Sequence, residues 1–275
     1  MQFQLTTDYL EKVVQLIANK DRIALRQLLK DIHFADIAEL LEKLNSEEAT
    51  YLIKSLESEI TSEALIELDE DDREKILNRL SPIEIAKEIE EMDTDDAADV
   101  VAELDDHIQK KVIEKIEDEE HASDIVELLN YEEDTAGALM AKELVKVKET
   151  WTVASCVREM RRQAENVTRV HSIYVTDKDD KLKGRLSLKD LLTASTKTHI
   201  SDVYISKVDY VSVDTKDEEV AKIMQKYDLE AIPVVDQKGV LVGRITIDDI
   251  VDFIKEEAEK DYQLAAGISQ DVEAD

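Results

Sequence analysis

The sequence predicts a multidomain α+β protein in which an N-terminal α-helical superhelix of short repeats precedes a duplicated α+β domain and a closing helix. Two internal periods predict this fold class. Apolar residues recur every twelfth position from about residue 33 to 130, and a 59-residue pattern repeats in the second half of the chain. The 275 residues suffice for two or three domains with cores of their own. We place the domain boundaries at 1–131, 132–198, 199–252 and 253–275.

The first period predicts a stack of two-turn helices. Each twelve-residue unit ends on an apolar residue that closes an amphipathic run such as AELLEKL or REKILNRL; these residues are Leu44, Leu56, Leu68, Leu80, Met92, Leu104 and Ile116. Unit starts carry residues that favour a helix N-terminus, among them Asn45, Asp69, Ser81-Pro82 and Asp93. Because so short a helix is not stable alone, we expect neighbouring units to stack around one continuous core. An ordinary irregular helical bundle is the alternative.

The second period predicts a duplicated domain. The repeated positions of the first copy are Val175, Asp177, Leu182, Gly184, Arg185, Asp190 and Leu191. Those of the second copy are Val234, Asp236, Leu241, Gly243, Arg244, Asp249 and Ile250. Each copy reads as strand, turn, strand and helix, and an amphipathic helix precedes it, TVASCVREMRRQ in one case and DEEVAKIMQKYD in the other. We therefore expect two α+β domains packed as a pseudo-symmetric pair.

The composition excludes several classes of function. With 66 Asp plus Glu against 35 Lys plus Arg, the formal charge of -31 opposes binding to nucleic acid or anionic lipid. A single cysteine, Cys156, and the lack of a signal-peptide pattern indicate a cytoplasmic setting. No run approaches the roughly 18 to 20 apolar residues of a membrane helix. The five histidines are scattered, and no GxSxG, HExxH or GxxxxGK[ST] motif occurs, so we do not expect an enzyme.

Two acidic clusters are candidate cation sites. Between Glu88 and Gln109 there are ten Asp or Glu residues and no Lys or Arg, and their repulsion costs stability unless a cation offsets it. Asp95 and Asp99 lie one helical turn apart, so their oxygens could converge on one hydrated Mg²⁺. The closing helix repeats the pattern with Asp249, Asp252, Glu256 and Glu259, and on a neighbouring stripe with Glu257 and Asp261. A solvated helix face is the alternative for this second cluster.

The repeated motif resembles that of a tandem pair of CBS domains. Gly184-x-x-Ser187-x-x-Asp190 returns as Gly243-x-x-Thr246-x-x-Asp249. Upstream, LLNYEEDTAGALM at 128–140 followed by Trp151-Thr152-Val153 resembles the junction that MgtE magnesium transporters place between an acidic helical N domain and their CBS pair. The likeness extends along nearly the whole chain, through KYDLEAIPVVD at 226–236 to the closing helix at 248–267. In the family that helix leads into a pore-forming membrane domain, which these residues do not include.

This resemblance implies a Mg²⁺-sensing regulatory region at the cytoplasmic face of the cell membrane, homodimeric through its CBS domains and joined to a membrane pore domain of the same polypeptide. Mg²⁺ would bridge acidic faces of the N domain, the CBS pair and the connecting helix, and favour a compact, closed state. The implied metal ligands are Asp95, Asp99, Glu218, Asp228, Asp249, Asp252, Glu257 and Asp261. Lys260 departs from the family pattern, because an acid is common there; its ammonium could replace part of one ion's charge.

Nucleotide binding is a second implication of the resemblance. In CBS pairs the aspartate after Ser or Thr often holds a ribose, and the MgtE cleft has been linked to ATP, which points to Lys189 and Asp190 as ATP contacts. Lys189 stands where a planar arginine is frequent, and Ser172 where an aromatic ring could stack on adenine. The alternative function is a soluble CBS module that senses adenine nucleotides and carries a helical domain for docking a protein. A carboxylate-based enzyme that uses Mg²⁺ would need a pocket that the sequence does not indicate.

Overall fold

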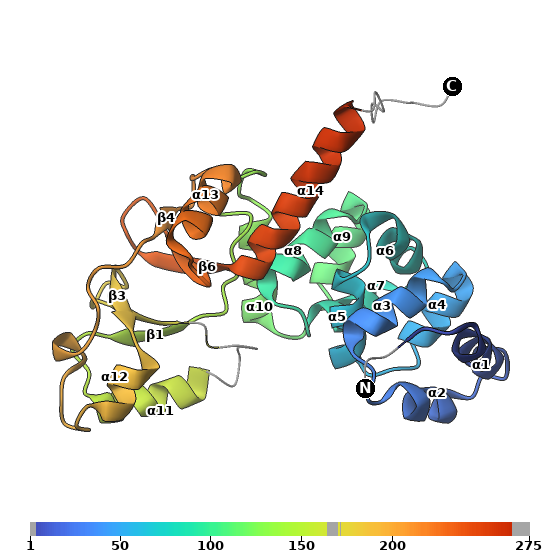
Figure 1. Cartoon of the computed structure of the whole chain (residues 1–275), viewed down its shortest axis with the longest axis horizontal. Helices are drawn as coiled ribbons and strands as arrows, with labels where there is room; N and C mark the ends of the chain where they lie inside the picture. Colours follow the sequence, from blue (N-terminus) through green and yellow to red (C-terminus); the bar gives the residue numbers. More distant parts are fainter. Residues whose placement is uncertain (1–3, 164–169, 171, 266–275) are drawn as a thin grey trace. The chain divides into compact units, whose positions relative to one another are not determined.

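The computed structural model describes residues 4–163, 170 and 172–265. It divides into two compact units, Met1–Leu129 and Asn130–Asp275, which we call the helical unit and the α+β unit (Figure 1). The helical unit contains helices only in its described part, and the α+β unit contains two small sheets with their helices. The predicted fold class, a repeat of short helices followed by a pair of α+β domains, is confirmed.

The twelve-residue period is the spacing of the helices. After α1 (Thr7–Ala18), successive helices begin twelve residues apart and α10 (Glu119–Leu128) closes the series. The regularly spaced helices are α2 (Arg22–Leu29), α3 (Phe34–Glu42), α4 (Ser46–Ile53), α5 (Ser58–Ile66), α6 (Glu70–Leu77), α7 (Pro82–Ile89), α8 (Thr94–Ala102) and α9 (Asp106–Ile113). The repeat therefore starts one unit earlier than the apolar pattern indicated.

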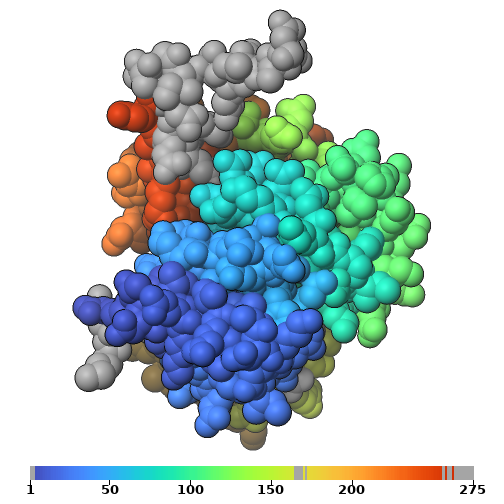
Figure 2. Space-filling view, turned by 90° about the vertical axis from the view of Figure 1, so that its right-hand side faces the viewer, coloured from blue at the N-terminus to red at the C-terminus, as the bar shows by residue number. Residues whose placement is uncertain are grey.

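Helices two apart in the sequence pack against each other. α3 contacts α5, α5 contacts α7, and α7 contacts α9, while α4 contacts α6 and α8 contacts α10. The unit-closing residues lie in the core that this stacking creates: all are buried except Leu56, which is half-buried. Figure 2 shows the successive units as neighbouring bands from blue to green. The arrangement is the expected stack of repeats, because each short helix buries its apolar face only against its neighbours.

The helix starts are capped as the sequence predicts. Asn45 and Ser81 form capping boxes with Glu48 and Glu84, and Pro82 occupies the first helical position of α7. The Asp69 side chain accepts a hydrogen bond from the backbone N–H of Asp72. Each such cap stabilises its helix by roughly 1 kcal/mol, a useful gain for helices of two turns.

Ion pairs about two and a half repeats apart join the helices of the stack. Lys54 Nζ lies 2.9 Å from a carboxylate oxygen of Glu84. The guanidinium of Arg73 contacts Glu103 and also donates to the carbonyl oxygens at the end of α5, those of Leu65, Ile66 and Leu68. Burial lowers the pKa of Arg73, but Glu103, helped by the charges of Asp99 and Glu70, raises it overall. This largely buried pair fixes the C-terminal turn of α5 against α8.

One buried carboxyl, that of Glu88, forms no ion pair within the described residues of the helical unit. Glu88 is 7% exposed on α7 and accepts a hydrogen bond of 2.5 Å from the hydroxyl of Thr61 on α5. Burial raises the pKa of Glu88 to about 7, and the charge of Glu91 adds to the increase, while the hydrogen bond and Lys87 oppose it. The folded helical unit therefore holds this proton at a pH where the unfolded chain has released it.

Each half of the α+β unit contains a three-stranded sheet. The first consists of β1 (Val145–Lys148), β2 (Ile173–Thr176) and β3 (Leu182–Leu186), with helices α11 (Val153–Gln163) and α12 (Leu188–Thr193). The second consists of β4 (Val211–Ser212), β5 (Ala231–Val235) and β6 (Leu241–Thr246), with α13 (Asp217–Tyr227) and α14 (Ile247–Ala265). In each sheet the first two strands are parallel and the last two antiparallel.

The two halves are copies down to their irregularities. The strand register shifts between Val175 and Thr176 in one and between Val234 and Val235 in the other. The turns that follow contain a residue of positive φ at Asp180 and at Gly239, again 59 positions apart. The predicted duplication is confirmed. α14 is continuous, so the boundary that we expected between residues 252 and 253 falls inside this helix.

Close backbone contacts explain the glycine of the repeated motif. β3 pairs through Arg185 with Ile205, and β6 pairs through Arg244 with Ala141. A Cβ atom on Gly184 would lie 2.1 Å from the carbonyl oxygen of Ile205, and one on Gly243 would lie 2.6 Å from the sulfur of Met140. The first α+β domain therefore pairs with the segment around Ile205, which leads into the second domain. The second domain pairs with the segment around Ala141, which leads into the first. These two contacts tie the pair into one unit.

The stability of the chain is predicted to depend on pH through Glu88. Its raised pKa contributes stability that is complete below the ordinary value of 4.5 and is lost as the pH rises toward about 7. The free energy of unfolding should fall over this range by up to roughly 1.4 kcal/mol per pH unit, and Glu88→Gln should remove that component. Urea unfolding at a series of pH values measures it. Glu39→Gln, at an exposed site on α3, is the control; an unchanged slope in Glu88→Gln would contradict the assignment.

Candidate functional site

The predicted metal ligands of the helical unit lie on α8. Asp95 and Asp99 are one turn apart; Asp95 is half-buried and Asp99 is exposed. Asp95 accepts the backbone N–H of Asp96 at 3.0 Å, and Asp99 lies close enough to Arg73 to affect the pKa of its guanidinium. Asp99 is the more accessible of the two to a hydrated ion, and both residues already have other interactions.

Two predicted ligands of the α+β unit take part in exposed ion pairs. Glu218 on α13 lies 2.8 Å from Lys222, and Asp252 on α14 lies 2.6 Å from Lys255. The Lys222 hydrogen bond and charge lower the pKa of Glu218. Exposed pairs of this kind contribute roughly 0 to 1 kcal/mol, so a divalent cation can replace the lysine at little cost.

Asp249 serves first as a helix cap. It is the third residue of α14, and its Oδ2 atom accepts hydrogen bonds from the backbone N–H of Thr246 at 2.7 Å and from the Thr246 hydroxyl at 2.8 Å. Burial raises the pKa of Asp249 to about 6, although these hydrogen bonds oppose the increase. This geometry is the physical reason for the Thr-x-x-Asp half of the motif. The corresponding Ser187 at the start of α12 makes no side-chain cap of this kind.

The remaining predicted ligands are Asp228, Glu257 and Asp261, all on the α+β unit. Asp228 is exposed at the C-terminus of α13 in a left-handed conformation, with φ of 53°. Glu257 and Asp261 lie on α14, but their side chains lie outside the described part of the chain. Over residues 4–163, 170 and 172–265, no three His, Cys, Asp or Glu side chains are grouped to hold one metal ion. Two of the eight predicted ligands thus belong to the helical unit and six to the α+β unit.

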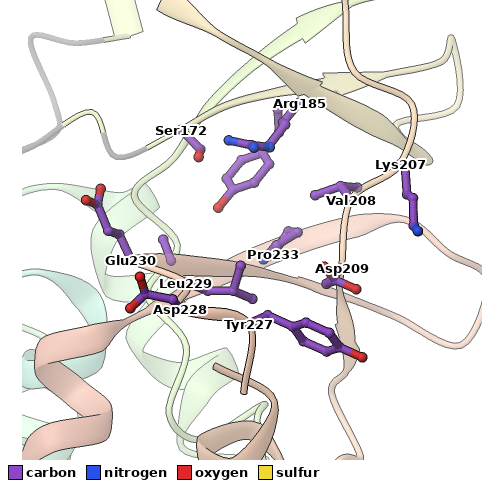
Figure 3. A pocket seen from close by; sticks show the side chains of 12 residues that line it. Ser172, Arg185, Lys207, Val208, Asp209, Tyr227, Asp228, Leu229, Glu230 and Pro233 are labelled. Carbon is purple, nitrogen blue, oxygen red and sulfur yellow. The ribbon is translucent and has the colours of Figure 1, made fainter. Parts of the chain in front are cut away.

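A cavity of about 420 Å³ lies in the α+β unit between the two α+β domains (Figure 3). β2 and β3 form one wall, and the end of α13 with β5 forms another; residues 207–209 complete it. The lining residues are Ser172, Tyr174, Arg185, Lys207, Val208, Asp209, Tyr227, Asp228, Leu229, Glu230, Ala231 and Pro233. Apolar side chains and both signs of charge meet here, as in sites for small organic ligands.

The predicted nucleotide contacts are Lys189 and Asp190, and neither belongs to the lining of this cavity. Ser172 lines it, whereas Lys189 and Asp190 lie on α12, with Lys189 exposed. Sequence reasoning did not select Tyr174 or Arg185 as site residues, although Arg185 belongs to the repeated set. No motif joins these residues to 207–209 and 227–233; only the packing of the two domains does.

In the described part of the chain, no helix combines the length and apolarity needed to cross a membrane.

Comparisons with known proteins match both units. The MgtE intracellular N domain matches residues 32–134, and the CBS domain matches residues 136–197 and 200–256. The magnesium transporter MgtE of Thermus thermophilus is 44% identical over 144 residues, which make up 52% of this chain and 32% of that protein. The chain spans about a third of the length of the curated relatives that it matches.

Two solved structures share the fold over most of the chain. One is described as the soluble part of a magnesium transporter, with a TM-score of 0.80, 30% identity and coverage of 91% of this chain and 98% of that one. The other is described as the cytosolic domain of the Mg²⁺ channel MgtE in complex with ATP, with a TM-score of 0.82, 34% identity and coverage of 89% and 99%.

The cap formed by Asp249 predicts that this carboxylate stabilises the fold, whereas the exposed carboxylate of Asp252 does not. In the absence of divalent ions, Asp249→Ala should lower the free energy of unfolding by roughly 1 to 2 kcal/mol, because the backbone N–H of Thr246 then loses its carboxylate acceptor, whereas the Thr246 hydroxyl keeps Asp248. Asp252→Ala removes an exposed pair and should cost less than about 0.5 kcal/mol. Urea unfolding in chelator measures both. Equal losses would show that Asp249 does not cap α14.

Proposed function

This chain belongs to the MgtE family, and we propose that it is the cytosolic, Mg²⁺-sensing regulatory region of a magnesium transporter. The family assignment supports this role, since the chain covers nearly all of two solved regions of such proteins and about a third of the full-length relatives. The proposed location is the cytoplasmic face of the cell membrane, with α14 leading toward a membrane pore domain of the same polypeptide. The proposed role is regulatory rather than catalytic.

The observation that carries the sensing proposal is the presence of accessible carboxylates on both units. Asp95 and Asp99 belong to a stretch of ten acids without Lys or Arg in the sequence. Glu218 and Asp252 on the α+β unit form exposed ion pairs with lysines. Mg²⁺ keeps several of its waters and needs few protein carboxylates. A site shared between the two units therefore requires no complete cage in either.

Such bridging ions would act as a two-state switch. Like charges separate the two units when Mg²⁺ is scarce, and the ion binds the compact state better because only that state supplies ligands from both. A shift from 1:99 to 99:1 in favour of the compact state requires roughly 10⁴-fold tighter binding, or about 5.5 kcal/mol. Several ions with few protein ligands each can supply this together. We propose that α14 transmits the compact state to the pore as closure.

Mg²⁺ is expected to protect the chain from proteolysis with a midpoint that depends on Asp95 and Asp99. The double variant Asp95→Ala, Asp99→Ala should need several-fold more Mg²⁺ for half-maximal protection, because the helical unit then lacks its bridging carboxylates. Glu39→Ala with Glu42→Ala removes the same charge from α3 and should behave as wild type. A midpoint shared by all three proteins would contradict the assignment. Protection by adenine nucleotide with none by Mg²⁺ would favour the rival, a soluble nucleotide-sensing CBS module.

We also propose that the α+β unit forms a homodimer. The last helix of each α+β domain exposes apolar side chains at equivalent positions: Leu188 and Leu192 on α12 are 57% and 74% exposed, and Ile247 and Val251 on α14 are 39% and 44% exposed. Leu188 corresponds to Ile247 and Leu192 to Val251, each at an offset of 59 residues. A face with such internal repetition is suited to an isologous contact, in which a second copy presents the same surface.

Charge on this face should prevent dimerisation. Leu192→Asp with Val251→Asp should shift the chain from dimer to monomer in light scattering at micromolar concentration, because two carboxylates would have to be buried at the contact. Ile23→Asp, on α2 of the helical unit and 81% exposed in wild type, is the control and should leave the mass unchanged. A dimeric double variant, or a monomeric wild type, would contradict the proposal.

A second proposed ligand is an adenine nucleotide in the cavity of the α+β unit. The specific observation in its favour is that one solved relative of 34% identity is described as a complex with ATP. The cavity offers Arg185 and Lys207 as cations and Leu229 and Pro233 as apolar surfaces. Nucleotide and Mg²⁺ would then act on the same unit through different residues, except for Asp228, which is both a cavity residue and a predicted metal ligand.

A further inference from the structure

One residue of the cavity lining carries a buried hydroxyl that has no hydrogen-bond partner in the part of the chain that the structure describes. Tyr174 on β2 is 1% exposed, and its hydroxyl makes no hydrogen bond within the described part of the chain. The neighbouring Ser172 interacts with the phenol and lowers its pKa slightly, but the pair does not meet hydrogen-bond geometry. Leaving such a group unsatisfied costs roughly 1 to 3 kcal/mol in general. The fold therefore carries at this point a polar group that its own residues do not use.

The charges around Tyr174 define the partner that it needs. Burial raises the pKa of Tyr174 to about 12, although Arg244 and Arg185 oppose the increase, so the phenol keeps its proton near neutral pH. A guanidinium has only donors and cannot accept from that hydroxyl. Arg244 also donates its Nε–H to the carbonyl oxygen of Glu143 at 2.6 Å. The partner that these cations cannot supply is a hydrogen-bond acceptor, and Tyr174 lines the cavity in which a ligand can offer one.

The rest of the lining indicates which part of a nucleotide carries this acceptor. Three carboxylates, Asp209, Asp228 and Glu230, exceed the two cations in the lining, so an uncompensated phosphate chain is repelled. Val208, Leu229 and Pro233 offer apolar surface to a flat, neutral ring. Figure 3 shows Leu229 and Pro233 on the wall opposite Ser172 and Arg185. These features fit the nucleoside end, with the phosphates directed outward.

We propose that Tyr174 is a specificity-determining residue of this cavity: its hydroxyl donates a hydrogen bond to an acceptor nitrogen of the adenine ring of a bound adenine nucleotide. This inference rests on the proposed nucleotide binding and adds to it the group that recognises the base. Serine at position 172 offers no ring on which the base can stack, so the hydrogen bond from Tyr174 contributes to recognition in its place.

The test compares Tyr174→Phe with wild type in calorimetric titrations with adenosine and with MgATP. Removal of one hydrogen bond should weaken both ligands by about tenfold and by the same factor. Without ligand, the melting temperature of Tyr174→Phe should be equal to that of wild type or higher, because the substitution removes an unsatisfied buried hydroxyl. Tyr210→Phe, at a residue that is 60% exposed and outside the lining, is the control and should change neither quantity.

Each other outcome has a defined meaning. Equal affinities of the variant and wild type would overturn the inference and leave nucleotide binding intact. A loss confined to MgATP would overturn the assignment to the nucleoside, and a lower melting temperature without ligand would show that the hydroxyl has a structural partner. Wild type that binds neither ligand would overturn both proposals.

If Tyr174→Phe folds poorly, the same hydrogen bond can be removed from the ligand instead of the protein. Adenosine analogues in which one ring nitrogen is replaced by CH should include one that binds wild type about tenfold more weakly than adenosine. That analogue should lose nothing further on Tyr174→Phe, because the two deletions remove the same hydrogen bond. A series in which every analogue binds wild type like adenosine would contradict a base acceptor.

Discussion

Repulsion between carboxylates is the constraint on which the rest of this molecule depends. The chain carries 66 acidic and 35 basic side chains, and its repeat of short helices packs a long acidic stretch into a small volume. Where folding requires a fixed contact, the chain supplies a base, as Arg73 does for Glu103 and Lys54 for Glu84. Where it supplies none, as at Glu88, the carboxyl keeps a proton instead. The folded state of this protein therefore depends on how the charge of each buried carboxylate is compensated.

The acidic residues fall into two classes: buried carboxyls that are hydrogen-bonded within the fold, and exposed carboxylates that form ion pairs with lysines. Asp249 is committed to the start of α14 through Thr246, and Glu88 to Thr61, so both act first in stability. Glu218 and Asp252 form exposed pairs with lysines, which an ion can displace at little cost. A sensor requires this second class, because a ligand can shift an equilibrium only through interactions that the other state lacks. Residue type alone does not separate the classes, but burial and hydrogen bonding do.

The sequence predicts the fold well because both of its periods are local. One apolar residue in twelve places every helix from α3 to α9, and the 59-residue offset places each strand and turn of the second α+β domain from those of the first. The cavity could not be predicted in this way, since β2, residues 207–209 and residues 227–233 meet only through tertiary packing. The repeated motif pointed to Lys189 and Asp190 as nucleotide contacts, whereas other residues line the cavity. The unsatisfied hydroxyl of Tyr174 has no signature in sequence at all.

The central claim is that Mg²⁺ bridges carboxylates of the two units rather than merely screening them. Small-angle scattering of the chain in millimolar Mg²⁺ and in NaCl of equal ionic strength tests it most directly, because screening depends on ionic strength and bridging on the divalent ion. The account predicts a smaller radius of gyration in Mg²⁺ than in chelator, and little change in NaCl. Identical dimensions in chelator and excess Mg²⁺, or equal compaction by both salts, would contradict it.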